Sequence, residues 1–384
     1  MSYSLHKKNS TITTTQLMCA IVFWLFSLAW LYWIQADLLT VAQFIYSDGQ
    51  THYNQTVGAL LLTLVLQLVQ QIVARFVKLN KRTHSLTYLP SMLILAWIGD
   101  FSVGNGTNYT SGIWPWLAPF ILLLWGGVVY IARQALPFDS PKEQTGVFSR
   151  RVWINMFTMT CMMLIVALVS NTNAVFHFRS HVEVSILEGD FDEALRTGAK
   201  SHETDESLTM LRAYALSKHG LLPDRLFEYP VAGRGDDLLP FFGSKSRTLL
   251  IPVDSFYAHL GARPIAIKSM TRYFELLEKD SLAKPSVADY QLCALLIDKK
   301  LDAFAHLLPR YYSIEQPLPK HYREAATMYV HLRAHPKFVY HNEVLEEDWR
   351  NFQELERGYP DKRERKGKVA EHYSNSYWYY YFYE

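Results

Sequence analysis

The chain changes character near residue 171, and this change constrains its fold more than any other feature. The 384 residues have a mean hydropathy of -0.03, which averages two different halves. Crossing a bilayer takes roughly 20 consecutive apolar residues of helix. Five apolar runs of about that length come first, at about residues 17–35, 57–77, 86–103, 113–132 and 153–169. We therefore predict a transmembrane domain over 1–171 and a soluble, extracytoplasmic helical domain over 172–384.

The basic residues of the short loops predict the orientation. They precede run one, join runs two and three, and join runs four and five: Lys7, Lys8, Arg75, Lys78, Lys81, Arg82, Arg133, Lys142, Arg150 and Arg151. The alternate loops, 36–56 and 104–112, contain no Lys or Arg. Because cytoplasmic loops carry the excess of Lys and Arg, the N-terminus is expected in the cytoplasm and 172–384 outside it. In a bacterium with two membranes this means the inner membrane and a periplasmic C-terminal domain.

Polar side chains inside the runs are few. Gln67, Gln70 and Gln71 share one face of the second run, which favours hydrogen bonds between helices. The centres of the runs hold no Asp, Glu, Lys or Arg, the residues that usually mark a translocation path. The pattern therefore argues against a transporter.

The predicted outer rim of the bundle carries a group of polar residues that could serve as a site. They are Asp37, Asp48, His52, Tyr53 and Asp100. A histidine beside carboxylates at one membrane face is able to perform general acid–base chemistry. Equally, such residues cap helices and face water, and no spacing rule ties these five together.

The second half has the apolar periodicity of paired amphipathic helices, so the whole chain is predicted to be all-α. Four turns align at Gly189, Gly220, Gly261 and Lys300, at intervals of 31, 41 and 39 residues. Tetratricopeptide repeats have a period of about 34 residues. We therefore predict a five-helix transmembrane bundle followed by a tetratricopeptide-like helical repeat domain. A generic helical bundle is the alternative.

Two aromatic segments are candidates for docking a partner or the membrane. Phe241 and Phe242 lie within 228–254, where several Pro and Gly residues forbid a continuous helix. The C-terminal segment follows a basic run at 362–368 and contains Tyr377, Trp378, Tyr379, Tyr380 and Tyr381. Such a set of rings would be a sticky patch if exposed, so it must pack on its own domain, on a partner or at the lipid headgroups.

Composition excludes several other classes of protein. The 38 Lys and Arg nearly balance the 36 Asp and Glu, which gives no nucleic-acid-binding footprint. The three cysteines have neither disulfide nor zinc-ligand spacing. We therefore predict no metal and no cofactor.

Three short motifs carry a resemblance to a known family. They are residues 50–54 (QTHYN), 226–230 (LFEYP) and 377–381 (YWYYY). With them the chain resembles, throughout its length, an uncharacterised family of multi-pass inner-membrane proteins from Bacteroides-type bacteria. The resemblance implies a Gram-negative inner membrane and a tetratricopeptide-like periplasmic tail that ends in aromatics. It implies no activity and no functional residues.

Three functions are weighed on this basis. The first is a membrane-anchored periplasmic scaffold that binds a protein partner, in envelope assembly or secretion; repeat-like helices generally present binding surfaces. The second is an outer-leaflet membrane enzyme that uses His52 and nearby carboxylates. The third is transport, which the uncharged runs disfavour.

Overall fold

The structure is a computed structural model that describes residues 3–47, 49–79, 81–100, 102–103, 109–110, 114–134, 149–241, 243–263 and 269–384. It divides into two compact units, Met1–Asn173 and Ala174–Glu384. This division lies two residues from the predicted boundary at 171/172. Apart from one antiparallel pair of two-residue strands, the described elements are helical, and the prediction of an all-α protein is confirmed.

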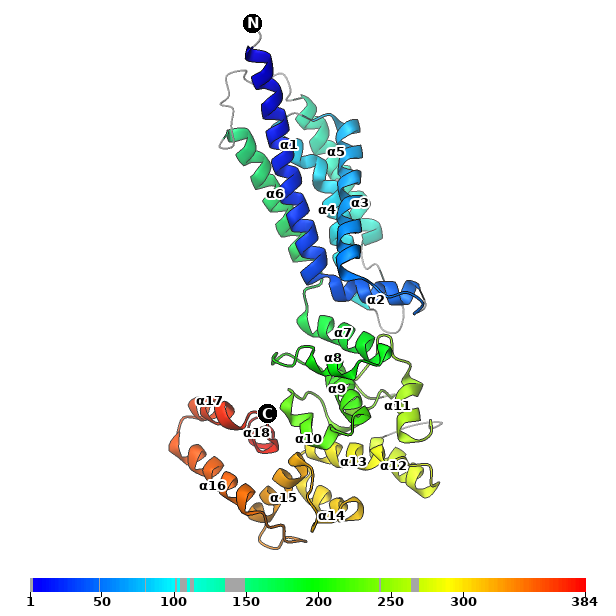
Figure 1. Ribbon diagram of the computed structural model, residues 1–384, viewed down its shortest axis with the longest axis vertical. Helices are drawn as coiled ribbons and strands as arrows, with labels where there is room; N and C mark the ends of the chain where they lie inside the picture. The colour runs from blue at the N-terminus through cyan, green and yellow to red at the C-terminus, as the bar shows by residue number, and fades with distance from the viewer. Residues whose placement is uncertain are drawn as a thin grey trace. The chain divides into compact units, whose positions relative to one another are not determined.

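The first unit, called the bundle here, consists of long apolar helices (Figure 1). Its elements are α1 Tyr3–Ala29, the π-turn η1 Trp30–Ile34, α2 Ala36–Tyr46, α3 Gln55–Val77, the 3₁₀ turn η2 His84–Tyr88, α4 Leu89–Gly99, β1 Ser102–Val103, β2 Tyr109–Thr110, α5 Trp114–Gln134 and α6 Arg150–Val169. Four described segments are long and apolar enough to cross a membrane: Thr15–Ile34, Gln55–Val77, Trp114–Gln134 and Arg150–Val169. The predicted run 86–103 becomes η2 followed by α4, which ends at Gly99.

Hydrogen bonds show that η2–α4 and α6 run side by side in the same direction. At one end, the Ser85 N–H donates to Asn155 Oδ1 of α6 (2.7 Å). At the other, the Asn171 N–H donates to the carbonyl of Gly99 (2.7 Å). Gln35, which follows α1 and η1, donates from Nε2 to the Asn171 carbonyl (3.3 Å) at this same end. The η2–α4 segment therefore extends along α6 from one end of the bundle to the other.

Helices α3 and α5 run in the opposite direction. Gln55, at the start of α3, donates from Nε2 to the carbonyl of Tyr32 in η1 (2.5 Å). Trp114, at the start of α5, donates from Nε1 to Asp100 (2.6 Å). Arg133, near the end of α5, donates to the last two carbonyls of α3 (2.9 and 2.7 Å). One end of the bundle, called the basic end, thus gathers Lys78, Lys81, Arg82, Arg133, Arg150 and Arg151.

The second unit is a domain of shorter helices, called the helical domain here (Figure 1). Its elements are α7 Ala174–Glu188, α8 Phe191–Arg196, α9 Glu206–Lys218, α10 Leu222–Arg225, η4 Leu226–Glu228, η5 Gly235–Leu238, α11 Val253–Leu260, α12 Met270–Lys279, α13 Ser286–Ile297, α14 Leu301–Tyr311, α15 Lys320–Leu332, α16 Glu343–Gly358, α17 Lys362–Tyr373 and α18 Tyr377–Tyr383. One continuous apolar core runs from Val182 to Tyr380.

Three of the four predicted turn residues have the left-handed backbone that favours glycine. Gly189, Gly220 and Gly261 have φ of 81°, 68° and 152°. At the fourth turn the left-handed residue is Lys299 (φ 56°), and Lys300 instead caps the start of α14. A lysine there costs about 1 kcal/mol relative to glycine.

The helix pairs do not form a regular repeat stack. In such a stack each unit contacts only its neighbours. Here the four-residue α10 packs against α15, far along the chain, and the Lys320 N–H donates to Asp224 (2.7 Å). Helix α18 packs on α15 as well. These contacts close the domain on itself.

Buried carboxylates support the irregular segment that follows η4. Glu183 of α7 is fully buried and accepts the backbone N–H groups of Leu249, Leu250 and Ile251. Burial raises the pKa of this carboxyl, and the three N–H groups oppose that rise. Asp237 accepts N–H groups from Arg234 (2.9 Å) and from Lys245 (2.7 Å) in the same way. Proline and glycine break the helix here, and side chains replace its hydrogen bonds.

Candidate functional site

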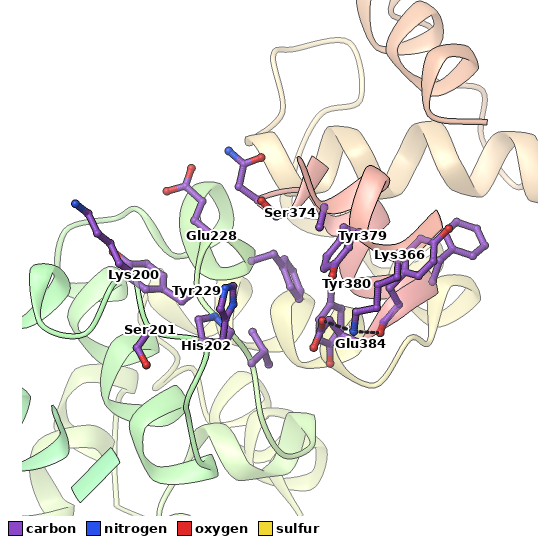
Figure 2. A pocket seen from close by; sticks show the side chains of 18 of the residues that line it. Lys200, Ser201, His202, Glu228, Tyr229, Lys366, Ser374, Tyr379, Tyr380 and Glu384 are labelled. Carbon is purple, nitrogen blue, oxygen red and sulfur yellow. Dashed lines mark hydrogen bonds and ion pairs between the residues drawn. The ribbon is translucent and has the colours of Figure 1, made fainter. Parts of the chain in front are cut away.

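A groove of about 1040 Å³ lies within the helical domain (Figure 2). One wall comes from residues 199–202 and 227–231, and the other from α17 and α18. Figure 2 shows Lys200, His202 and Tyr229 on the first wall, facing Tyr379 and other side chains of the second. The groove therefore unites the basic run and the aromatic tail with residues 227–230, which belong to the LFEYP motif.

The aromatic tail forms α18, and its first turn is anchored in the core. Ser376 caps the helix by accepting the Tyr379 N–H (3.2 Å). The Tyr377 N–H donates to the carboxylate of Glu324 (2.7 Å), and Trp378 Nε1 donates to the carbonyl of the same residue (2.7 Å). Tyr377, Trp378 and Tyr380 are buried. The aromatic residues predicted to dock a partner or the membrane are thus largely the domain's own core.

A buried histidine joins the two walls. The Phe227 N–H donates to Nε2 of His321 (3.3 Å), so the ring proton lies on Nδ1. Nδ1 then donates to Glu324 (2.9 Å), the residue that also holds Tyr377. Both His321 and Glu324 are buried. The spacing of the walls is therefore fixed by a fully hydrogen-bonded network rather than by loop contacts.

The carboxylates of the groove are already paired. Burial alone would raise the pKa of Glu228, but bonds from Arg225 (2.9 Å) and Lys320 (3.2 Å) outweigh it, so the pKa lies below its usual value. Glu384 pairs with Lys366 (3.1 Å), which raises the pKa of that ammonium. The negative charges in the groove are therefore neutralised from within the domain.

Three cations of the groove remain available. Lys200, Lys362 and Arg363 line it with exposed side chains. Among the residues that the structure describes, none of the three forms a salt bridge within 4 Å. The groove therefore presents an uncompensated positive charge.

Half-exposed rings line the same groove. Tyr379 and Tyr383 stack at 5.4 Å between ring centroids, and the Lys366 ammonium lies 5.9 Å from the Tyr379 centroid. Phe382 is 39% exposed. Rings with one face on protein and one face toward the groove offer apolar contact area at low entropic cost. The site thus combines anion-attracting and ring-stacking surfaces.

The candidate residues at the outer rim are placed on helix ends and loops. Asp37 lies in the first turn of α2, and Asp100 accepts the Trp114 indole N–H. The carbonyl of His52 accepts a hydrogen bond from Gln43 (3.5 Å). Tyr53 lies against Gly58, where a Cβ would come within 2.5 Å of its ring. Asp48 and Phe242 lie outside the described residues, and Phe241 packs against the core of the helical domain.

One pair that sequence reasoning missed resembles a nucleophile and its base. Ser217 Oγ lies 2.8 Å from His259 Nε2. Burial first, then the charges of Lys218 and Lys284, lower the pKa of His259 to about 4. A catalytic base works best with a pKa near the operating pH, so this ring is poorly suited to that role. In the described part of the chain, no three His, Cys, Asp or Glu side chains are grouped to hold a metal ion.

Comparison with known families places the whole chain in one group. The model of the family of unknown function DUF6057 matches residues 17–282 and 265–384. The chain belongs to this family. The match spans both the bundle and the helical domain, so both parts are features of a DUF6057 protein. The searches of curated proteins and of solved structures gave no match.

Proposed function

We propose that this DUF6057 protein crosses a bacterial inner membrane five times, with its N-terminus in the cytoplasm and its helical domain in the periplasm. Four described helices have the length and composition of spans. The fifth crossing is η2 followed by α4. Five 3₁₀ residues and eleven α residues extend about 26 Å, close to the roughly 30 Å of a hydrocarbon core.

Two observations support this topology. The η2–α4 segment lies along α6 from end to end, so it spans wherever α6 does. The cations of the loops gather at the basic end, whereas Asp37 and Asp100 belong to the opposite end. This separation of charge is the one expected of a bundle whose basic end is cytoplasmic.

A reporter fusion tests the topology. A reporter that works only in the periplasm, fused after Glu384, is expected to be active, and one fused after Lys78 is expected to be silent. Activity after Glu384 of a reporter that works only in the cytoplasm would mean an even number of crossings. The η2–α4 segment would then not span.

We further propose that the helical domain is a membrane-anchored scaffold that binds a protein partner in envelope assembly or secretion. The groove carries this proposal, because it holds three exposed cations, without salt-bridge partners among the described residues, beside half-exposed tyrosines. Such a surface is complementary to an extended acidic segment that also contains an aromatic residue. Its paired carboxylates and fixed walls provide preorganisation, which lowers the entropic cost of binding.

Charge reversal in the groove tests the binding proposal. The probe is a fluorescent nine-residue peptide of Asp, Glu and Tyr, with a Lys-containing peptide of the same length for comparison. The full chain in detergent is expected to bind the acidic peptide, more weakly as salt rises. The variant Lys362→Glu with Arg363→Glu is expected to lose at least tenfold in affinity.

The matched control is Lys279→Glu with Lys337→Glu, which changes the net charge equally at exposed positions outside the groove. It is expected to stay within about twofold of the natural protein. Equal loss in both double variants would show that net charge, and not the groove, attracts the peptide. Photo-crosslinking from position 363 in native membranes then identifies the natural partner.

A further inference from the structure

The bundle contains a cavity with several amide groups in its lining, and the scaffold function does not use it. It has a volume of about 460 Å³ and lies between α1, α3 and η2. Arg75, two residues before the end of α3, and His84, the first residue of η2, place its mouth at the basic end. The lining residues on α3 run from Gln67 to Arg75, so the cavity extends about 12 Å along that helix.

The three glutamines of α3 have different roles here. Gln70 is buried and donates from Nε2 to Thr87 of η2 (2.9 Å), so it joins two helical segments as the sequence predicted. Gln67 donates to Gln70 (2.8 Å), but its own Oε1 is buried without a hydrogen-bond partner among the described residues. Gln71 is exposed and lines the cavity. Helix–helix bonding therefore explains only Gln70.

A buried polar atom without a partner is destabilising, and polar groups at membrane depth are usually functional. Gln16 and Gln71 add further amide groups, and the Arg75 guanidinium is exposed at the mouth. None of the described lining residues is Asp or Glu. The cavity thus offers the amide groups of Gln16 and Gln71, the carbonyl oxygen of Gln67 and the positive charge of Arg75, with no Asp or Glu in its described lining.

The cavity also opens toward the outer surface of the bundle. Leu17, which lines it, is 58% exposed, and Gln71 and Arg75 are exposed on the neighbouring helix. If the bundle crosses a membrane, this surface faces lipid. A ligand with an apolar tail can therefore insert its polar head from the side. Basic pockets between membrane helices on the cytoplasmic side are suited to anionic lipid headgroups.

We infer that this cavity binds the phosphate-bearing headgroup of an anionic phospholipid from the cytoplasmic leaflet. Arg75 contacts the phosphate, and the amide N–H groups of Gln16 and Gln71 donate to the headgroup oxygens. Gln67 Oε1 accepts a hydrogen bond from a headgroup hydroxyl, such as those of phosphatidylglycerol. The acyl chains lie along the exposed apolar face beside Leu17. The inference rests on the proposed membrane orientation of the bundle, and it is independent of the groove.

Lipid binding to the full chain in detergent tests the inference. The probe is phosphatidylglycerol, compared with phosphatidylcholine and with soluble glycerol phosphate, and the readout is lipid retained in native mass spectrometry. Phosphatidylglycerol is expected to be retained at least tenfold more strongly than phosphatidylcholine. Equal retention of the two lipids, or binding of glycerol phosphate as tight as that of the lipid, would overturn the proposal.

Three single variants locate the site. Arg75→Gln and Gln71→Leu, both at exposed helix positions, are expected to weaken retention about tenfold and several-fold, with unchanged circular dichroism. Arg150→Gln is the control, because it removes an exposed charge from the same end but does not line the cavity. Equal losses in Arg75→Gln and Arg150→Gln would mean diffuse attraction to the basic end and would overturn the cavity assignment. None of these variants alters the groove, so peptide binding there is a separate result.

Discussion

The two units of this protein each bury an apolar core but expose opposite kinds of side chain. The bundle exposes large apolar residues, with Trp116, Leu123 and Leu168 all more than 75% exposed, and it buries polar ones such as Gln70 and Asn155. The helical domain instead buries most of its aromatics and, apart from a few bonded residues such as Glu183 and Glu324, exposes its charges. Both use ordinary α-helices, so helix propensity does not separate them. The difference in exposed surface supports the proposal that the bundle lies in a membrane and the helical domain in water.

Separating the two units is expected to have the largest effect. Residues 174–384 expressed alone are expected to form a soluble, folded helical domain, because its core is continuous and its helices cover one another. Residues 1–173 are expected to require detergent, because their apolar faces have no protein cover. Circular dichroism and size-exclusion chromatography provide the measurement. Aggregation of the helical domain in water would contradict the proposal that this unit folds in water by itself.

A pair of tryptophans tests burial next. Trp378 is 2% exposed and bonded to the Glu324 carbonyl, whereas Trp116 is 85% exposed. Trp378→Ala is expected to destabilise the helical domain by about 3–5 kcal/mol, as for other buried aromatics. Trp116→Ala is expected to change the stability of the bundle by less than about 1 kcal/mol. Denaturant titration measures the stability of the Trp378→Ala variant, and thermal unfolding in detergent measures that of Trp116→Ala. Similar losses of stability in the two variants would contradict the assignment of Trp378 to the core and Trp116 to the surface.

The next prediction compares two exposed leucines, one in each unit. Leu123 lies near the middle of α5 and is 77% exposed, and Leu282 of the helical domain is 51% exposed. Leu123→Lys is expected to disfavour membrane insertion by roughly 3 kcal/mol, since lysine at the centre of a span is unfavourable. Leu282→Lys is expected to change stability by less than about 0.5 kcal/mol. The fraction of the Leu123→Lys chain that is inserted in the membrane is the measurement. An unchanged fraction would mean that α5 does not face lipid at Leu123.

The smallest expected effect concerns His259. Its folded pKa of about 4 lies below the unfolded value of 6.5, so the unfolded chain takes up the proton first as the pH falls. The contribution of His259 to the free energy of unfolding is therefore greatest above about pH 6.5 and is lost as the pH falls toward 4. The loss is about 2 kcal/mol, a value reduced to allow for the partial exposure of the ring. The variant His259→Gln keeps a hydrogen-bonding group for Ser217 without titrating. Its unfolding free energy should fall less over this interval; identical pH profiles would contradict the prediction.

Much of the fold could be predicted from the sequence because the signals are local. Hydropathy indicated the four long apolar helices, and glycine chemistry indicated the turns at Gly189, Gly220 and Gly261. The fourth turn was displaced by one residue, to Lys299, because lysine carries no comparable preference for left-handed backbone. Uneven spacing predicted a tetratricopeptide-like repeat, with a generic helical bundle as the alternative. The packing of the short α10 against α15 departs from a stack in which each unit contacts only its neighbours. Spacing does not encode which distant helix a turn will meet.

The candidate sites were less predictable. The basic run at 362–368 had no assigned role, the tail was expected to pack on its own domain or to dock, and nothing marked residues 199–202. The groove depends on Phe227, His321, Glu324 and Tyr377, which lie far apart in sequence and meet through three hydrogen bonds. Likewise, the sequence indicated the polar face of α3 but not the cavity beside it. Nor did it show that Gln70 bonds to another helical segment while Gln67 and Gln71 do not.

Local sequence was enough to specify which half holds the long apolar helices and where most of the helices begin and turn. These properties depend on the transfer free energies and backbone preferences of residues that are close together in the sequence. Which charges are neutralised and which are left for a ligand was settled only by the packing of distant segments. Glu228 is satisfied by Arg225 and Lys320, while Lys362 and Arg363 have no salt bridge among the described residues, although all are ordinary charged residues in the sequence. Pairing depends on distances of a few ångströms between segments, and those distances exist only after the chain has folded.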